Sequence, residues 1–289
     1  MSKIKRNFIV GEEWLYYKIY CGYHTADKIL TNEVQIIINK LFKQKLIDQW
    51  FFIRYHDPDF HLRLRFHLVN LNSITEVIEL IKSHFSKLFE NDTIYDVILP
   101  TYKREIERYG ESTILYSEKL FYYNSKKIIE LISKTVPEFD EITRILSSLH
   151  MIANLLKYFE IPIDVSLAFV TDRYLHFKLE HNIQKENIAK MTKLFSIYKP
   201  EILLLLSENR DPQHLEGLNK ILKLKVEEIK TIKKILNNVP TDNSSYVLDL
   251  IASFIHMNIN RTFRSKQREY ELICYDFMSR YYKYIIYKK

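Results

Sequence analysis

The residues best suited to chemistry lie between Trp50 and Leu68, where cationic and apolar side chains alternate. The cationic positions are His61, Arg63, Arg65 and His67, and the apolar ones are Leu62, Leu64, Phe66 and Leu68. Strand side chains point alternately to opposite faces, so this pattern predicts one cationic face and one apolar face. Arginine recognises carboxylates and phosphates through paired donors. The alternation therefore favours an anion-binding surface over its simpler alternative, a solvated strand face.

Two further groups of residues could complete such a site. Arg104 and Arg108 are four positions apart and share one side if the segment is helical, although pairing with Glu105 or Glu107 is the simpler explanation. His256 shares a predicted helix with Asn260 and Arg261, and a hydrogen-bonded core histidine is the simpler interpretation of it alone. Combined, a histidine base and several arginines could remove a proton beside a carbonyl and hold an anionic leaving group.

The elements that position these residues divide the chain near residue 100. Aromatic and β-branched runs predict strands at 14–21, 50–55 and 93–99, with 14–21 paired to 50–55, and the His56–Asp59 turn joins two strands. Apolar spacing predicts helices at 31–47, 73–89, 112–134 with a break near 123–125, 140–159, 165–183, 186–197, 214–237, 246–263 and 266–287. We expect one α+β domain over residues 1–289, with a β-rich N-terminal part packed on a mostly helical C-terminal part.

Composition excludes several classes of protein. The 289 residues are 47% hydrophobic, enough for a sizeable core. The formal charge of +7 is spread along the chain and attracts acidic partners only weakly. With four glycines and no GxGxxG or GxxxxGK[ST] segment, glycine-lined nucleotide loops are absent, and we expect no cofactor and no direct contact with nucleic acid. Cys21 and Cys274 are too isolated for a disulfide framework or a zinc site, so no metal is expected. No apolar run is long enough to span a membrane, which favours a cytoplasmic location.

Five segments, in order, resemble one known family. They are WLYYKIYCG with AD.IL at Trp14 to Leu30, FIRYHDPDFHLRLRF at Phe52 to Phe66, TYKREIERYG at Thr101 to Gly110, SEKLFYYNS at Ser117 to Ser125 and IHMNINR at Ile255 to Arg261. This set is similar to the thiopeptide-type bacteriocin biosynthesis domain. That domain is the C-terminal, glutamate-eliminating part of class I lantibiotic dehydratases and also occurs as a free-standing protein.

The resemblance implies a function. A partner domain esterifies Ser or Thr of a ribosomal precursor peptide with glutamate from glutamyl-tRNA, and this domain then expels glutamate to leave dehydroalanine or dehydrobutyrine. By motif match, His256 would move the proton, while Arg63 or Arg65 and Arg104 or Arg108 would hold the glutamyl carboxylates and the developing enolate, with Arg63 and Arg104 preferred as the catalytic pair. The substrate-binding residues would be Arg54, His61, Arg65, Arg108, Asn260 and Arg261. We expect the precursor peptide and a separate glutamylation protein as partners.

The sequence departs from the family pattern at two positions. The family's usual RYGG is Arg108-Tyr109-Gly110-Glu111 here, so a glutamate replaces the second glycine. Asn124 stands where an acidic residue is usual before Ser125. Two alternatives therefore stay open. One is a thiopeptide pyridine synthase, which joins two dehydroalanines in a formal [4+2] cycloaddition, although Arg63, Arg104 and His256 favour elimination. The other is a non-catalytic subunit that binds the precursor peptide along an edge strand.

Overall fold

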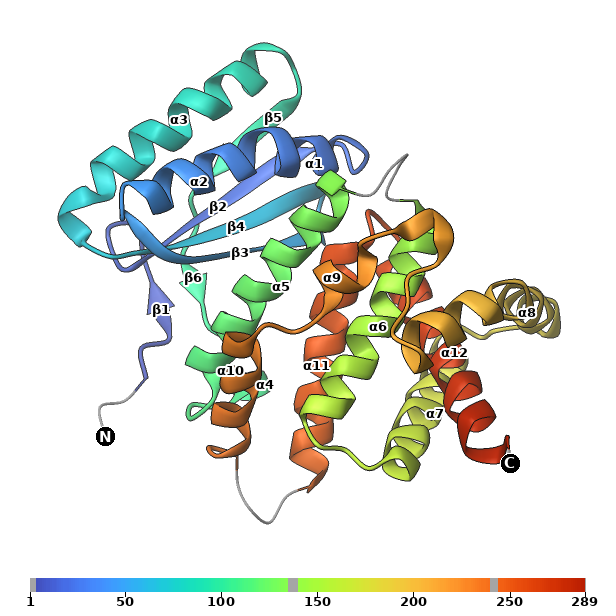
Figure 1. Cartoon of the computed structure of the whole chain (residues 1–289). Helices are drawn as coiled ribbons and strands as arrows, with labels where there is room; N and C mark the ends of the chain where they lie inside the picture. Colours follow the sequence, from blue (N-terminus) through green and yellow to red (C-terminus); the bar gives the residue numbers. More distant parts are fainter. Residues whose placement is uncertain (1–3, 135–139, 240–243, 289) are drawn as a thin grey trace. The chain divides into compact units, whose positions relative to one another are not determined.

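The computed structural model describes residues 4–134, 140–239 and 244–288, which form two compact units. Unit 1 comprises the chain up to residue 134 together with 237–239, and unit 2 comprises the remainder. Strands belong to unit 1, while the described part of unit 2 is helical, which confirms the predicted α+β class with a sheet in the N-terminal part (Figure 1).

Unit 1 is built on a sheet whose strands run in the order β3-β4-β2-β5. The strands are β1 (Asn7–Phe8), β2 (Trp14–Cys21), β3 (Ile47–His56), β4 (Phe60–Leu68), β5 (Ile94–Ile98) and β6 (Tyr102–Lys103). The predicted hairpin across residues 56–59 is confirmed, because β3 pairs antiparallel with β4. The predicted pairing of residues 14–21 with 50–55 is wrong. β4 folds back between those two strands, so β2 pairs with β4 and β5 instead.

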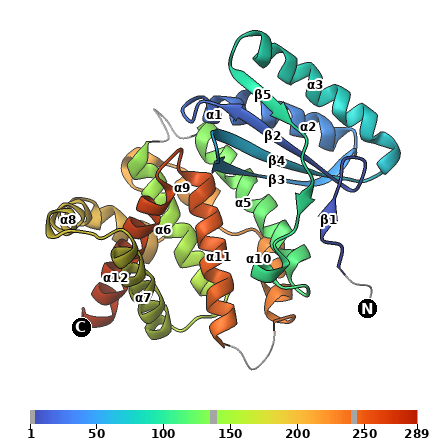
Figure 2. The ribbon, with the colours of Figure 1, turned by 180° about the vertical axis from the view of Figure 1, so that it is seen from behind.

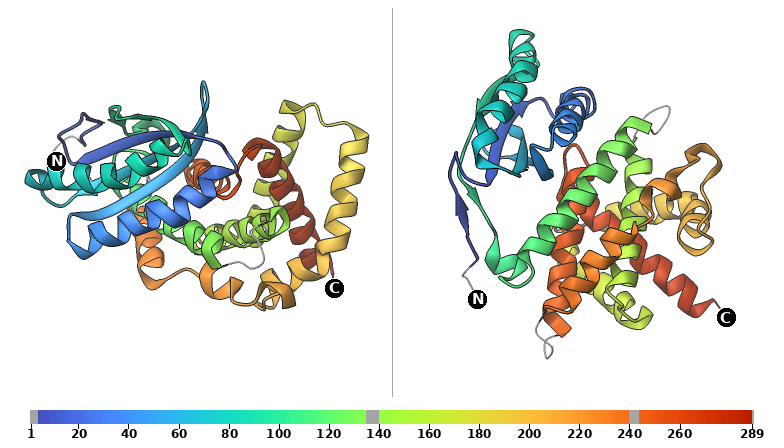
Figure 3. Two further views of the ribbon diagram at one scale, coloured as in Figure 1. Left: turned by 90° about the horizontal axis from the view of Figure 1, so that it is seen from above. Right: turned by 60° about the vertical axis from the view of Figure 1, so that its left-hand side comes forward.

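The helical segments of unit 1 lie on both sides of this sheet (Figures 1 and 3). They are α1 (Thr25–Lys28), the π-helical turn η1 (Ile29–Val34), α2 (Gln35–Lys43), the 3-10 turn η2 (Leu71–Ser73), α3 (Ile74–Glu90), α4 (Ile106–Tyr109) and α5 (Ile114–Lys134). The predicted break near 123–125 is wrong. Ser125 is fully buried and its hydroxyl accepts a hydrogen bond from the Phe52 amide at 3.1 Å, so packing on β3 keeps these poor helix formers helical.

The sheet has an apolar face and an aromatic-cationic face, as the alternation of β4 predicts. Leu62, Leu64 and Phe66 are fully buried. On their side, the ring of Tyr17 lies 6.2 Å from those of Phe66 and of Phe85 in α3. Arg65 on the opposite face is also buried, at 7% exposure. The simpler alternative of a solvated cationic face is therefore wrong for this part of β4.

Unit 2 is a group of packed helices (Figure 2). They are α6 (Glu141–Tyr158), α7 (Ile163–Glu180), α8 (Lys185–Ser207), the 3-10 turn η3 (Gln213–Leu215), α9 (Leu218–Leu222), α10 (Val226–Leu236), α11 (Ser244–Thr262) and α12 (Gln267–Tyr287). In this group, α6 contacts α8, α11 and α12. The helix predicted at 186–197 continues through Pro200 because Ile202 and Leu205 are buried beyond it. The single helix predicted at 214–237 is divided into three segments. Among the described helices, none has the length and apolar character needed to cross a bilayer.

Candidate functional site

Arg65 is a buried cation that makes no hydrogen bond within the described residues. Its side chain leaves β4 on the aromatic face and is 7% exposed. Three rings surround the guanidinium, with their centroids 4.4 Å away for Tyr16, 5.1 Å for Phe51 and 4.9 Å for Tyr102. Its Nε and Nη1 atoms are buried and unpaired. Cation–π attraction offsets part of the desolvation of this charge but leaves its donors unsatisfied.

Two other buried arginines of unit 1 are held by carboxylates, which makes Arg65 unusual. Arg54 is 1% exposed and donates from Nη2 to Asp27 at 2.5 Å. It is the cross-strand partner of Leu62 and therefore belongs to the apolar face. Arg54 thus lies on the face opposite to Arg63 and Arg65, and its role in binding substrate stays a prediction.

Arg104 is also paired, because each of its three guanidinium nitrogens donates a hydrogen bond. Its Nε and Nη2 atoms each donate to a Glu118 carboxylate oxygen at 2.7 Å, and Nη1 donates to the Lys5 carbonyl at 2.9 Å. The Tyr102 hydroxyl donates to the same carboxylate at 2.7 Å. Burial, and next the Glu118 charge, raise the pKa of Tyr102 well above its ordinary value. Glu118 thus fixes a ring that encloses Arg65.

The predicted helical pairing of Arg104 with Arg108 is wrong. Arg104 precedes α4 and is buried, whereas Arg108 lies within α4 and is exposed. Arg108 donates to Glu105 at 3.2 Å, the simple surface pairing considered from the sequence. Surface ion pairs of this kind are weak, so Arg108 can exchange Glu105 for another carboxylate more readily than Arg104 can leave Glu118.

Arg63 and His61 form a second polar group on the face of Arg65. Arg63 Nε donates to His61 Nε2 at 3.0 Å, and the guanidinium lies 3.4 Å above the Tyr55 ring. His61 Nδ1 is 2.9 Å from the Asp59 carbonyl, so the neutral ring donates from Nδ1 and accepts at Nε2. Burial lowers the pKa of His61, as this neutral state requires. Within the described chain, the Nη atoms of Arg63 have no hydrogen-bond partner.

His256 lies on α11 in unit 2 and is oriented by a carboxylate. Its Nδ1 atom is 2.8 Å from Glu271 of α12, which is 2% exposed. A proton on Nδ1, donated to Glu271, leaves Nε2 as the basic atom of the neutral ring. The His256 side chain remains 27% exposed. The core-histidine interpretation is therefore incomplete, because this ring is held at one nitrogen and partly open to solvent.

The two other predicted residues of α11 differ from each other. Arg261 is fully buried and donates from Nη1 to the Met257 carbonyl at 3.1 Å within its own helix. Asn260 is half-buried. The roles of Asn260 and Arg261 in binding substrate stay predictions.

Three residues of these arrangements were missed by sequence reasoning. Glu118, Glu271 and Tyr102 hold or surround the predicted residues, yet they are separated from their partners by intervals without a regular helical period. The one available signal was a carboxylate on the buried side of an apolar helix pattern, as at Glu271.

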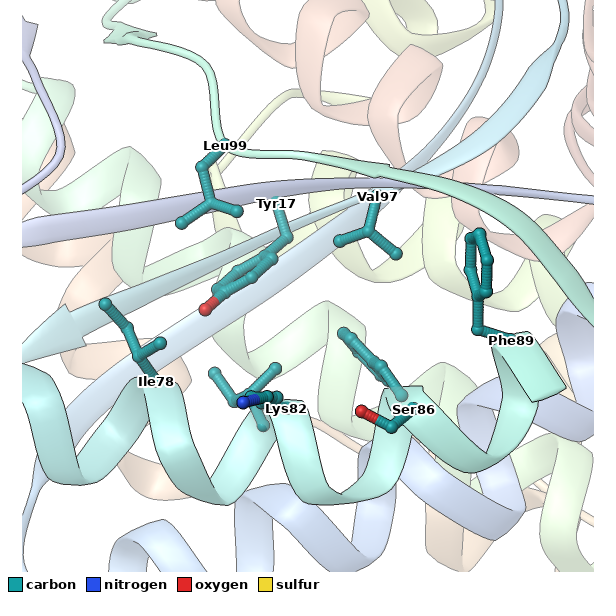
Figure 4. Close-up of a pocket in the computed structure, with 9 residues that line it drawn as sticks. Tyr17, Ile78, Lys82, Ser86, Phe89, Val97 and Leu99 are labelled. Atoms are coloured by element: carbon teal, nitrogen blue, oxygen red, sulfur yellow. The ribbon is translucent and has the colours of Figure 1, made fainter.

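Two cavities of unit 1 lie away from the predicted residues. One, of about 280 Å³, lies between α3 and β5 and is shown in Figure 4. The other, of about 450 Å³, is lined by residues of α2, α5 and Trp50 of β3. Neither is lined by the predicted arginines or by His61.

Comparison with known families gives a match over nearly the whole chain. The model for the C-terminal part of lantibiotic biosynthesis dehydratases matches residues 14–282. The subtilin biosynthesis protein SpaB of Bacillus subtilis is 26% identical over 273 residues, covering 91% of this chain and 24% of SpaB. The nisin biosynthesis protein NisB of Lactococcus lactis subsp. lactis is 30% identical over 141 residues, covering 46% of this chain and 13% of NisB. The chain therefore spans about a quarter or less of these relatives.

Solved structures share the fold. The tRNA-dependent lantibiotic dehydratase MibB from Microbispora sp. 107891 superposes with a TM-score of 0.67 at 20% identity, covering 94% of this chain and 28% of MibB. TsrL gives 0.65 at 11% identity, with 96% of both chains covered. The pyridine synthase TbtD from thiomuracin biosynthesis gives 0.59 at 10% identity, covering 96% of this chain and 99% of TbtD.

Proposed function

The chain belongs to the family of lantibiotic biosynthesis dehydratase C-terminal domains, and on that premise we propose that it eliminates glutamate from glutamylated Ser or Thr of a ribosomal precursor peptide. The product is dehydroalanine or dehydrobutyrine. A separate protein supplies the glutamyl ester. The observation that carries the proposal is the unpaired guanidinium of Arg65, since a buried cation without a partner anion is costly unless a ligand provides the anion.

The elimination needs one base and one anion-binding group. A base removes the proton from Cα of the esterified residue, the electron pair forms the Cα–Cβ double bond, and the Cβ–O bond breaks to release glutamate as a carboxylate. Arginine donors suit both the enolate and the departing carboxylate. On unit 1, Arg65 and Arg63 have donors available for this role.

His256 is the proposed base. Its contact with Glu271 supports this role, because a carboxylate at Nδ1 leaves Nε2 free to accept a proton and stabilises the imidazolium that forms. Arg104 stays in the proposal as a positioning residue, since Glu118 already occupies its donors. Arg108, with its weak contact to Glu105, takes the place first expected for Arg104.

A defined substrate tests this proposal. The purified protein is incubated with a synthetic peptide that carries one glutamyl ester, and the products are followed by mass spectrometry. Elimination gives a peptide lighter than the free serine peptide by one water, whereas ester hydrolysis returns the serine peptide itself. We expect elimination by the wild type and its loss in His256→Ala and Arg65→Gln.

His84→Ala is the matched control. His84 also contacts a carboxylate through Nδ1, at 2.7 Å from Glu33, but it lies on α3 away from the proposed residues. Its variant should keep wild-type turnover. Intact ester in the presence of folded wild-type protein would sink the elimination proposal and leave the peptide-binding subunit as the better explanation.

A second candidate is pyridine formation by cycloaddition. The likeness to TbtD over nearly all of both chains favours it, although that likeness concerns the fold. Supplying a peptide that already contains two dehydroalanines distinguishes the candidates. A macrocyclic pyridine product would support the synthase, and its absence alongside active elimination would exclude it.

A further inference from the structure

A pocket of about 280 Å³ lies on unit 1 between α3 and the edge of the sheet. It is lined by Tyr17, Ile78, Ile81, Lys82, Phe85, Ser86, Phe89, Val97 and Leu99. Figure 4 shows Tyr17 extending from the sheet towards α3, with Val97 and Leu99 on the strand side. Phe89 is 54% exposed and stands at the rim of this otherwise apolar lining. The pocket is thus an apolar recess open to a ligand.

Three polar groups of this pocket have unused hydrogen-bonding capacity. Within the described residues, the Tyr17 hydroxyl, the Ser86 hydroxyl and the Lys82 ammonium form no hydrogen bond or ion pair. Tyr17 is only 3% exposed, and Figure 4 shows its hydroxyl on the side of Ile78 and Lys82. Burial raises the pKa of Tyr17, so the phenol is a neutral donor. An apolar recess with a few directed polar groups is the usual form of a specific binding site.

The adjoining strand can accommodate an extended chain. At the other edge of the sheet, α5 packs on β3 and Ser125 accepts the Phe52 amide. Among the described strands, β5 pairs with β2 alone, so its outer edge has no strand beside it. The Asp96 carboxylate accepts the Val97 amide at 2.8 Å, which leaves only part of the backbone available for pairing. Side-chain anchoring, rather than a complete ladder, would then determine affinity.

We propose that this pocket anchors an extended acidic segment of the precursor peptide. One aromatic or branched aliphatic side chain fills the recess, the Tyr17 hydroxyl donates to a backbone carbonyl of the segment, and a neighbouring carboxylate binds Lys82. Lys82 is the single charged residue of the lining, and a carboxylate complements it. The identification of the ligand as the precursor peptide rests on the proposed function, whereas the chemistry of the pocket does not.

Charge reversal at two lysines of α3 tests the site. The probe is a short fluorescein-labelled peptide with one Phe between two Asp residues in a Ser and Thr background, and fluorescence anisotropy measures its Kd. Lys82→Glu should weaken binding by about tenfold or more. Lys87→Glu makes the same charge change on the same helix, outside the pocket lining, and should leave Kd unchanged. Equal effects of both variants, or no binding by the wild type, would overturn the proposal.

Filling the pocket gives an independent measurement. Ser86→Phe places a ring in the recess and should abolish probe binding, while circular dichroism monitors folding. Replacing the Phe of the probe by Ala should weaken binding to the wild type by about tenfold. Retained affinity in both experiments would show that the apolar recess does not hold the peptide.

Turnover of a short glutamylated peptide without the acidic segment separates this inference from the proposed function. Lys82→Glu should eliminate glutamate from that substrate at the wild-type rate. Loss of probe binding with no elimination by any form would retain the pocket and reject the enzyme. If the protein eliminates glutamate but the Kd of the probe is the same for wild type and Lys82→Glu, the proposed function stands and the proposed binding site is wrong.

Discussion

The guanidinium of Arg65 and that of Arg104 lie in one unit but have opposite surroundings. Rings enclose Arg65 without a carboxylate, while Glu118 binds Arg104 at two points. Removing a buried charge with no partner relieves a desolvation penalty, whereas removing one member of a buried pair leaves the other uncompensated. The two arginines should therefore respond oppositely to the same substitution.

We expect Arg65→Leu to keep or raise the free energy of unfolding, by up to about 1 kcal/mol, while abolishing elimination. Arg104→Leu should lower that free energy by about 3–5 kcal/mol, because the carboxylate of Glu118 stays buried without its partner. Urea denaturation measures both. A strong destabilisation by Arg65→Leu would show that this cation has a structural partner after all.

Glu271 positions the imidazole of His256. We expect Glu271→Gln to lower kcat on the order of 10² while leaving KM unchanged, because the imidazolium loses its counter-charge and substrate contacts stay intact. Glu180→Gln is the control. Glu180 binds Arg268 at 2.6 Å, and Arg268 in turn approaches Glu271 at 3.6 Å, so the control alters charge one step further from the ring.

A kcat loss in Glu180→Gln as large as that in Glu271→Gln would mean that the general charge of the cluster matters, not the contact with the ring. Nitrogen chemical shifts of the labelled histidine add a readout independent of turnover. The wild type should show the proton on Nδ1, and Glu271→Ala should lose that preference.

His61 predicts how the stability of unit 1 depends on pH. Its folded-state pKa is lowered from the ordinary 6.5 by burial. The unfolded chain therefore binds a proton first as the pH falls, and the contribution of His61, fully present above about pH 6.5, is lost on acidification towards the lower folded-state pKa. His61→Gln should flatten the plot of unfolding free energy against pH in this window. An unchanged slope would contradict the buried neutral state.

At the scale of elements, the buried tyrosines on the two faces of the sheet differ in the hydrogen bonds of their hydroxyl groups. Tyr17 on the apolar face makes no hydrogen bond within the described chain, whereas Tyr102, across the aromatic face, donates to Glu118. Tyr17→Phe should change the free energy of unfolding by less than about 0.5 kcal/mol. Tyr102→Phe should cost about 1–3 kcal/mol, because a buried carboxylate oxygen loses one of its two donors. Thermal unfolding of both variants checks this contrast. Equal losses of unfolding free energy in the two variants would contradict it.

Local patterns were enough to predict several elements. The β3–β4 hairpin follows from alternation on both sides of the Asp57-Pro58-Asp59 turn, and α6 begins where Asp140 accepts the Thr143 amide. These features depend on neighbours in sequence. The position of β2 between β4 and β5 depends on contacts between distant segments, and no local pattern encodes it.

The same limit applies to the candidate site: local patterns predict its position on the strand, but not its contacts with distant segments. Alternation in β4 placed Arg63 and Arg65 on one face, as the structure has them. The carboxylates that decide which cations are available could not be assigned, since Asp27 precedes Arg54 by 27 residues and Glu118 follows Arg104 by 14. Only folding shows which arginine is paired.

At the scale of the whole molecule, the family match extends across both compact units. This supports the expected single functional domain over residues 1–289, which we retain as a proposal. The formal charge of +7 is also a property of the whole chain and favours acidic peptides at a distance.

We therefore expect binding of the acidic probe peptide to weaken as salt is added. The Debye length falls from about 10 Å at 0.1 M to about 3 Å at 1 M ionic strength, so long-range attraction is lost while contacts inside the apolar recess persist. Stopped-flow fluorescence should show the effect mainly in the association rate. A dissociation rate that carries the whole effect would instead place the relevant charges inside the contact.

The burial of the two cysteine thiols matters because of the proposed product. Dehydroalanine is an electrophile that thiolates attack, so an enzyme that forms it risks alkylating itself. Cys21 and Cys274 are both buried, and burial raises the pKa of Cys21 to about 12 and also that of Cys274. Nucleophilic addition requires an accessible thiolate. The fold thus keeps both sulfur atoms inert toward the reactive peptide that the chain is proposed to release.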